Sequence, residues 1–216
     1  PKIGLTLEPG RSHAGQIEIA RIGIDDPEPE GLPRVEMWTA RGAGRLFPVR
    51  PPAAHKGTFG RIMVIAGSKG MLGAASLCVR GCLRAGAGLV RLAHPQGLEG
   101  ELPGLWADAI TAGSAATARV GFARTAALDL EEMAATQDVV ALGPGLGRTS
   151  QIRDLIAGLV LTIDRPLVLD ADGLYALTDG GEGLRERSAV TILTPHPGEA
   201  ARLLSTEIGA INTDRV

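Results

Sequence analysis

The fold is decided by residues 61–93, which read RIMVIAGSKGMLGAASLCVRGCLRAGAGLVRLA. The apolar run Arg61–Ala66 predicts a buried strand, and Leu89–Ala93 predicts a second one. Between them, the stretch from about Gly73 to Ala85 predicts a helix whose side chains are apolar around most of its circumference, so we expect it to pack against a sheet. Two strands joined by one helix form a parallel βαβ unit. The sequence therefore predicts a layered α/β protein.

Further short apolar runs extend this pattern toward the C-terminus. Asp138–Leu142, Leu167–Asp170 and Ala189–Leu193 are each typical of parallel strands that are buried on both faces. A helix with apolar residues at helical spacing follows the first of them, and Ser150 is its expected N-cap. The Ala-rich stretch 113–132 predicts only a loop and a helix. We therefore expect a mostly parallel sheet with helices packed on it.

The composition changes sharply before this sheet begins. Apolar and polar residues alternate from Ile17 to Ile24, which predicts a half-buried strand that belongs to something upstream. Proline and charged residues then dominate, as in a connector between domains. We expect three parts: residues 1–24 as the end of one domain, 25–53 as a linker, and 54–216 as part of a second domain. The chain begins with Pro1 instead of Met and looks like a piece of a longer protein.

Charge and hydropathy argue against two classes of partner. The formal net charge is −2, and no stripe of Lys or Arg is present that would follow a phosphate backbone, so we expect no nucleic acid partner. No apolar run reaches the ~18 residues that cross a bilayer, so we expect no membrane partner and a cytoplasmic location. Cys78 and Cys82 are expected to be small core residues, and no spacing predicts a metal site.

Three glycine- or proline-rich loops follow predicted strands, at the sheet edge where open parallel sheets bind ligands. Residues 66–74 and residues 143–147 fit a binding loop and an ordinary tight turn equally well. Residues 193–199 place His196 between two prolines that restrict its backbone, which favours a ligand contact over a freely solvated imidazole. Asp170 and Asp172 follow another strand, where carboxylates hold a magnesium shell or a ribose hydroxyl, or serve as turn and capping residues.

Six segments in a fixed order resemble the ADP/ATP-dependent NAD(P)H-hydrate dehydratases. They are His55–Gly60, Val64–Ser68 with Gly73–Ala75, Arg84–Gly88, Gly143–Gly147, Asp170–Gly173 and Thr194–Glu199. The resemblance implies a ribokinase-like three-layer α/β/α fold with a mostly parallel sheet, incomplete at the C-terminus. Residues 1–24 resemble the C-terminal end of the NAD(P)H-hydrate epimerase domain that is fused upstream in bifunctional bacterial members.

The resemblance also implies a reaction and a set of binding residues. Such enzymes repair hydrated nicotinamide cofactors: a nucleotide phosphorylates the ring hydroxyl, and loss of the phosphate regenerates NADH or NADPH. The fused epimerase interconverts the two hydrate epimers. Carried over to this sequence, Ala74, Gly145 and His196 contact the hydrate, with Glu199 and Asp172 in supporting positions. ADP or ATP is the implied co-substrate, with Mg2+, and the full-length protein is expected to form a homo-oligomer.

Two motifs of that family are absent from residues 1–216. The family holds its nucleotide with a later Lys-Gly-x-x-Thr segment and a Gly-Thr-Gly-Asp helix start whose aspartate lies at the reacting hydroxyl. The sequence contains no Gly-x-Gly-Asp. The catalytic aspartate and the nucleotide contacts are therefore expected beyond residue 216, and we expect this piece alone to bind substrate poorly and to be inactive.

Two other interpretations remain open at this point. A ribokinase-fold kinase of a vitamin precursor shares the sheet, although it does not match residues 194–199 together with residues 143–147. A nucleotide-binding module without catalysis is the alternative from a different class. Assays of the completed enzyme with NADH hydrate and with a vitamin precursor distinguish the first, and titration with ADP and NADPH addresses the second.

Overall fold

The computed structural model describes residues 3–20, 22–23, 38–101, 108–177 and 181–213. The chain divides into two compact units, one of residues 1–50 and one of residues 51–215. The boundary between them falls inside the predicted linker. The exact layout of 1–24, 25–53 and 54–216 stays a prediction. No helix among the described residues is both long enough and apolar enough to cross a membrane.

The first unit contains three short helical segments: η1 (Ile3–Leu5), α1 (Gly10–Ala14) and α2 (Ala40–Gly44). The strand predicted from Ile17 to Ile24 is wrong for the residues that the structure describes there, 17–20 and 22–23, which are not in a strand. Residues 21 and 24 lie outside the described part. Ile19 and Ile22 are exposed. Alternation alone does not make a strand, because strands need hydrogen-bonded neighbours, and the described residues of this unit supply none.

The second unit carries the predicted sheet and its helices. Its described residues form strands β1 (Arg61–Ile65), β2 (Leu89–Pro95), β3 (Ile110–Ser114), β4 (Val139–Leu142), β5 (Leu167–Leu169) and β6 (Thr191–Leu193). The α-helices are α3 (Leu72–Ala85), α4 (Ala127–Ala135), α5 (Ser150–Thr162), α6 (Asp172–Tyr175), α7 (Pro197–Leu203) and α8 (Ile208–Thr213). Four 3-10 turns complete it: η2 (Lys56–Phe59), η3 (Glu99–Glu101), η4 (Arg124–Ala126) and η5 (Glu182–Glu186).

The six strands form one sheet in the order β3-β2-β1-β4-β5-β6, and every adjacent pair is parallel. From β1 the chain first builds outward through β2 to β3, then returns to add β4 on the other side of β1. This reversal places a topological switch point between β1 and β4. The loops that follow these two strands are residues 66–71 and 143–149. They are the two glycine-rich loops singled out from the sequence, and they meet where such sheets bind ligands.

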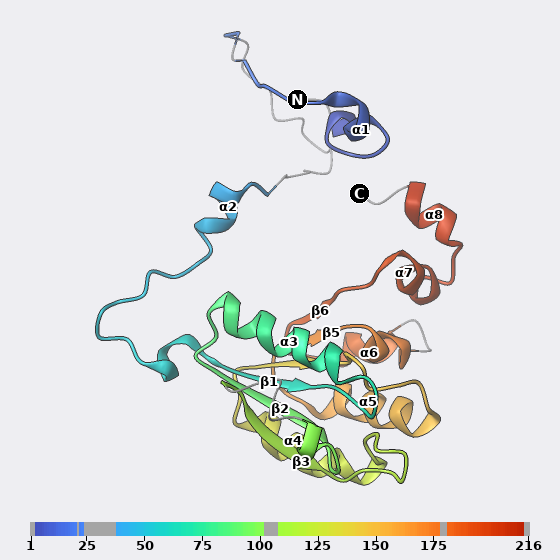
Figure 1. The fold of residues 1–216 in the computed structure, drawn as a ribbon. Helices are drawn as coiled ribbons and strands as arrows, with labels where there is room; N and C mark the ends of the chain where they lie inside the picture. Colours follow the sequence, from blue (N-terminus) through green and yellow to red (C-terminus); the bar gives the residue numbers. More distant parts are fainter. Residues whose placement is uncertain (1–2, 21, 24–37, 102–107, 178–180, 214–216) are drawn as a thin grey trace. The chain divides into compact units, whose positions relative to one another are not determined.

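Helices cover both faces of the sheet, as Figure 1 shows. Strand residues alternate between the faces: Met63 and Ile65 join the core with α4 and α5, whereas Val64 joins the core with α3. The predicted three-layer α/β/α arrangement is therefore confirmed. The centre of the sheet lies in the core, because Met63, Val64 and Ile65 are fully buried.

Two local predictions were wrong. The first residue of α5 is Ser150, and its N-cap is Thr149, whose hydroxyl accepts a hydrogen bond from the Ile152 N–H. Strand β3, of which only the last two residues fall in the Ala-rich stretch 113–132, was not predicted. It lies at the edge of the sheet, and its sequence ITAGS lacks the continuous apolar character of the central strands.

Candidate functional site

Two loops meet at the switch point between β1 and β4. The Gly67 N–H donates to the Pro144 carbonyl oxygen at 2.9 Å, and the buried Ser68 hydroxyl donates to the Gly145 carbonyl oxygen at 2.8 Å. A Cβ placed on Gly145 would lie 3.2 Å from the Cβ of Ala74 in the first turn of α3. The structure thus brings Ala74 and Gly145 together, as the sequence-based assignment requires.

The glycines of the second loop are fixed by packing. Gly143 has φ +134°, and a Cβ there would lie 1.9 Å from the Asp170 carbonyl oxygen. Gly145 has φ +70°, and its Cβ would lie 2.7 Å from the Met71 carbonyl oxygen. A side chain is excluded at both positions by sterics and by the positive φ. The loop is therefore a close-packed wall in which small residues are obligatory.

A cavity of about 480 Å³ opens beside this wall. Ala74 and Gly145 line it, together with Cys78 from α3 and with Asp170 and Thr194 from the ends of β5 and β6. Its volume is in the range of small-molecule sites. The cavity combines an apolar lining from α3 and the sheet with a small polar edge at Asp170 and Thr194, which suits a ring that carries a few polar groups.

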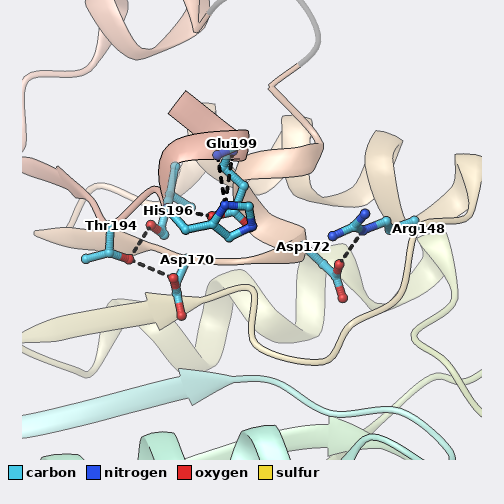
Figure 2. Close-up of polar contacts among 8 residues, drawn as sticks. Arg148, Asp170, Asp172, Thr194, His196 and Glu199 are labelled. Atoms are coloured by element: carbon cyan, nitrogen blue, oxygen red, sulfur yellow. Dashed lines mark hydrogen bonds and ion pairs between the residues drawn. The ribbon is translucent and has the colours of Figure 1, made fainter. Parts of the chain in front are cut away.

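The two aspartates have separate structural partners (Figure 2). The Thr194 hydroxyl donates to Asp170 Oδ1 at 2.8 Å, which ties the ends of β5 and β6 together. Asp172 is buried, and its Oδ2 accepts the Gly147 N–H at 2.9 Å while its Oδ1 accepts Arg148 Nε at 2.8 Å. Hydrogen bonding and attraction from Asp172 raise the pKa of Arg148. Asp172 therefore holds the loop after β4 onto α6, which favours the turn interpretation for this residue.

His196 is the N-cap of α7, and its ring is oriented by that role (Figure 2). Nδ1 accepts the backbone N–H groups of Gly198 at 3.0 Å and Glu199 at 3.3 Å. A nitrogen that accepts hydrogen bonds carries no proton, so the neutral ring has its proton on Nε2. Nε2 lies 3.3 Å from Glu199 Oε1, and the side chain of His196 is 65% exposed. The Nε2 donor therefore faces the buried Glu199 carboxylate.

Glu199 forms the other half of the same cap. Its side chain is buried, and Oε2 accepts the His196 backbone N–H at 3.0 Å. The arrangement is a reciprocal capping box in which each residue satisfies a backbone donor of the other. Glu199 is therefore a support for His196 within the cap, and its supporting position toward the substrate stays a prediction.

A chain of contacts that the sequence did not reveal links these parts. The guanidinium carbons of Arg148 and Arg202 lie 4.9 Å and 4.7 Å from the ring centroid of Tyr175. Arg148 belongs to the loop after β4, Tyr175 to α6 and Arg202 to α7. Cation–π contacts of this kind stabilise the arrangement modestly. They connect the loop at Gly145 with the helix that carries His196.

No metal site is apparent among the described residues. Within the described ranges, no group of three or more His, Cys, Asp or Glu side chains is placed to hold a metal ion. Cys78 and Cys82 are free and half-buried. Of the polar residues described above, Asp170 and Thr194 line the cavity, whereas Asp172, His196 and Glu199 lie outside its lining.

Comparison with known proteins names the family. A family model described as NAD(P)H-hydrate dehydratase matches residues 62–216, which contain the whole sheet apart from the first residue of β1. This chain belongs to the NAD(P)H-hydrate dehydratase family. The resemblance seen in the six sequence segments is thereby confirmed, and the vitamin-precursor kinase is not favoured.

Relatives of full length are bifunctional. The chain is 38% identical over 221 residues to the bifunctional NAD(P)H-hydrate repair enzyme Nnr of Moorella thermoacetica, and 31% identical over 219 residues to that of Escherichia coli. Both alignments cover 100% of this chain but only 41% and 39% of the relatives. The chain thus spans about two-fifths of the length of these proteins.

Solved structures support the same fold. The ADP/ATP-dependent NAD(P)H-hydrate dehydratase of Bacillus subtilis, co-crystallised with ATP/Mg2+, has a TM-score of 0.65 and 28% identity, covering 84% of this chain and 60% of that one. A ribokinase-like superfamily protein of Enterococcus faecalis has a TM-score of 0.62 at 23% identity, covering 78% and 57%. The fold of this chain is therefore ribokinase-like.

Proposed function

We propose that the protein containing this chain dehydrates NAD(P)H hydrate to NADH or NADPH at the expense of ADP or ATP, and that its upstream part epimerises the hydrate. The observation that carries the proposal is the contact of Ala74 with Gly145 at the wall of a ring-sized cavity. Membership of the dehydratase family supplies the reaction class. The bifunctional relatives support the epimerase half.

Ala74 and Gly145 are the surfaces on which the hydrated ring lies in this proposal. Neither has a side chain beyond Cβ, so the ring approaches the backbone closely. The neighbouring Pro144 and Leu142 make the same cavity apolar. A reduced nicotinamide ring carries no charge, and an apolar wall suits it.

His196 is the polar contact to the substrate. Because its Nδ1 accepts hydrogen bonds from the α7 backbone, Nε2 is the atom left to donate to an oxygen of the substrate, in place of its present contact with Glu199 Oε1. Glu199 accepts the His196 backbone N–H and so fixes the cap, and Asp172 accepts the Gly147 N–H and so fixes the loop after β4. Both act as positioning residues.

The nucleotide enters as co-substrate and brings Mg2+ with its phosphates. The Bacillus relative, which was crystallised with ATP/Mg2+, supports this part of the proposal. The nucleotide supplies the phosphoryl group that converts the ring hydroxyl into a leaving group. The described residues bind and orient the hydrate, and no metal-ligating cluster is found among them.

Two variants of His196 in the complete enzyme test the assignment. Asn is as good an N-cap as any residue, so His196→Asn is expected to keep α7 intact, whereas His196→Ala costs about 1 kcal/mol of stability. Both remove the Nε2 donor, and we expect each to raise the KM for NADH hydrate about tenfold, the loss of one useful hydrogen bond. An unchanged KM in His196→Asn, with normal stability, contradicts a substrate contact.

The cellular setting is proposed on the same basis. We propose a cytoplasmic enzyme that forms a homo-oligomer and whose partner is the hydrated dinucleotide, with no nucleic acid or membrane partner. The near-balanced charge of the chain supports this proposal. Light scattering of the complete protein and fractionation of cells measure the two properties.

A further inference from the structure

A second cavity is lined by Ser68, whose hydroxyl donates to the carbonyl oxygen of Gly145 in the lining of the first. Its volume is about 460 Å³, close to that of the first cavity. It is lined by three segments: the loop after β1, the loop between β3 and η4, and the end of the loop after β4 with the start of α5. None of its lining residues belongs to the set that the sequence assigned to the hydrate. The first cavity and its residues leave this space unexplained.

The charges around the second cavity have one sign. Lys69 and Arg119 line it, and none of the lining residues is Asp or Glu. Neither cation forms an ion pair with any carboxylate in the part of the chain that the structure describes. The Lys69 N–H donates to the Val120 carbonyl oxygen at 3.0 Å, so the two loops that carry these cations are fastened to each other. The cavity therefore has two free cations, from adjacent loops, at one opening.

The floor of the second cavity is apolar. Phe122, Leu146 and Ile152 are buried there, and Met71 adds its side chain to the wall. A pocket with an apolar floor and cations at its rim suits a ligand with a flat ring and a phosphate group. An uncharged ring alone would leave both cations without a partner.

The two cavities share one wall. Met71 lies against Gly145 through its carbonyl oxygen, and a Cβ on Gly147 would lie 3.6 Å from Met71 Cε. Gly145 lines the first cavity, and the next residues, Leu146 and Gly147, line the second. Consecutive residues of one loop thus line the two cavities, and this adjacency is what joins them in one proposed ligand site.

We propose that the second cavity binds the adenosine half of the dinucleotide substrate, with its ring on Phe122 and Leu146 and its phosphates at Lys69 and Arg119. This inference rests on the proposed function, because it takes NAD(P)H hydrate as the ligand of the first cavity. It assigns a separate place to the part of the substrate that does not react. Binding energy from that part contributes to affinity without touching the hydrated ring.

Single-charge variants of the complete enzyme test the proposal. Lys69→Ala and Arg119→Ala each remove one cation from the cavity, and Arg80→Ala is the matched control because Arg80 is exposed on α3 and lines neither cavity. The KM values for NADH hydrate, NADPH hydrate and ADP are measured for each variant. The Kd of NADPH is measured separately by its fluorescence, which does not depend on turnover.

We expect Lys69→Ala and Arg119→Ala to raise the KM for NADPH hydrate and the Kd of NADPH about tenfold, as loss of a charge-assisted contact does. The kcat, the KM for ADP and the Arg80→Ala values stay unchanged. An effect on both hydrates identifies the diphosphate as the contact, and an effect on NADPH hydrate alone identifies the 2′-phosphate; both outcomes support the site.

Two outcomes overturn the proposal while leaving the proposed function intact. One is an active enzyme whose dinucleotide constants are unchanged in Lys69→Ala and Arg119→Ala. The other is an active enzyme in which these variants raise the KM for ADP instead, which assigns the cavity to the nucleotide co-substrate. A wild-type enzyme that does not dehydrate the hydrate overturns the proposed function, and the second-cavity assignment with it.

Discussion

At the scale of single residues, steric contacts decide more of the site than polar chemistry does. Gly143 is confined by the Asp170 carbonyl oxygen, and Gly145 by Met71. Both glycines stand in the motif that identifies the family, yet the structure explains them by the close approach of two loops. A glycine motif at a strand end thus indicates close backbone packing before it indicates a ligand site.

Substitution of Gly143 tests this packing. Gly143→Ala is expected to destabilise the protein by about 3 kcal/mol or more, because the new Cβ collides with backbone and φ is positive. Gly158→Ala is the matched control: Gly158 lies inside α5 with open space around its Cα, so the change should stabilise by about 0.5–1 kcal/mol. Urea unfolding of both variants measures the difference. Equal stabilities contradict the packing account.

The cysteine pair on α3 gives a pH-dependent prediction. A hydrogen bond from the Cys78 thiol lowers the pKa of Cys82 to about 7, while the hydrogen bond to Cys82 and burial raise the pKa of Cys78. The thiolate is the reactive form. Alkylation of Cys82 by iodoacetamide should therefore accelerate as pH rises through about 7, with Cys78 unreactive.

Removal of the partner thiol is the control for that titration. In Cys78→Ala the stabilising hydrogen bond is lost, so the pKa of Cys82 rises and the alkylation profile moves to higher pH. Mass spectrometry of the labelled peptide follows both positions. A profile that does not move in Cys78→Ala shows that the hydrogen bond is not the cause.

At the scale of elements, the central elements and the edge strand β6 were predictable, whereas the edge strand β3 was not. Strands β1 and β2 follow from apolar runs that are largely buried in the sheet, and helix α3 follows from the apolar residues that it packs against that sheet. Strand β3 was missed because an edge strand needs less apolar sequence. The strand predicted at residues 17–24 failed because alternation carries no information about a pairing partner.

The candidate site also has a part that the sequence predicted and a part that it did not. The positions of Ala74, Gly145 and His196 at strand ends follow from the order of the motifs along the chain. The contacts of Tyr175 with Arg148 and Arg202 join three elements that are distant in the sequence. No local spacing encodes such contacts, so they needed the structure. The only advance signal was the position of Arg148, directly after the glycine loop.

Asp172 is expected to matter more than its ion-pair partner. Asp172→Ala leaves the Gly147 N–H without its acceptor and should cost about 1–3 kcal/mol. Arg148→Ala should cost less than about 1 kcal/mol, because Arg148 is 54% exposed and its ion pair is screened. Thermal unfolding ranks the two variants, and hydrogen exchange at the Gly147 amide reports the local effect. The reverse order contradicts the role of Asp172 as a loop anchor.

At the scale of the whole molecule, the parallel sheet explains why residues from distant parts of the chain lie at one edge. The order β3-β2-β1-β4-β5-β6 brings the loops after β1, β4, β5 and β6 to one edge. Ala74, Gly145, Asp172 and His196 each follow one of these strands. Residues that follow these strands line both cavities.

The most direct test of the account uses the complete enzyme with purified NADH hydrate. We expect NADH absorbance to be recovered only when ADP or ATP is present together with Mg2+. One nucleotide phosphate should be consumed for each NADH formed. We also expect His196→Asn to weaken this recovery at low hydrate concentration. A folded complete enzyme that recovers no NADH, or that phosphorylates a vitamin precursor instead, contradicts the central claim.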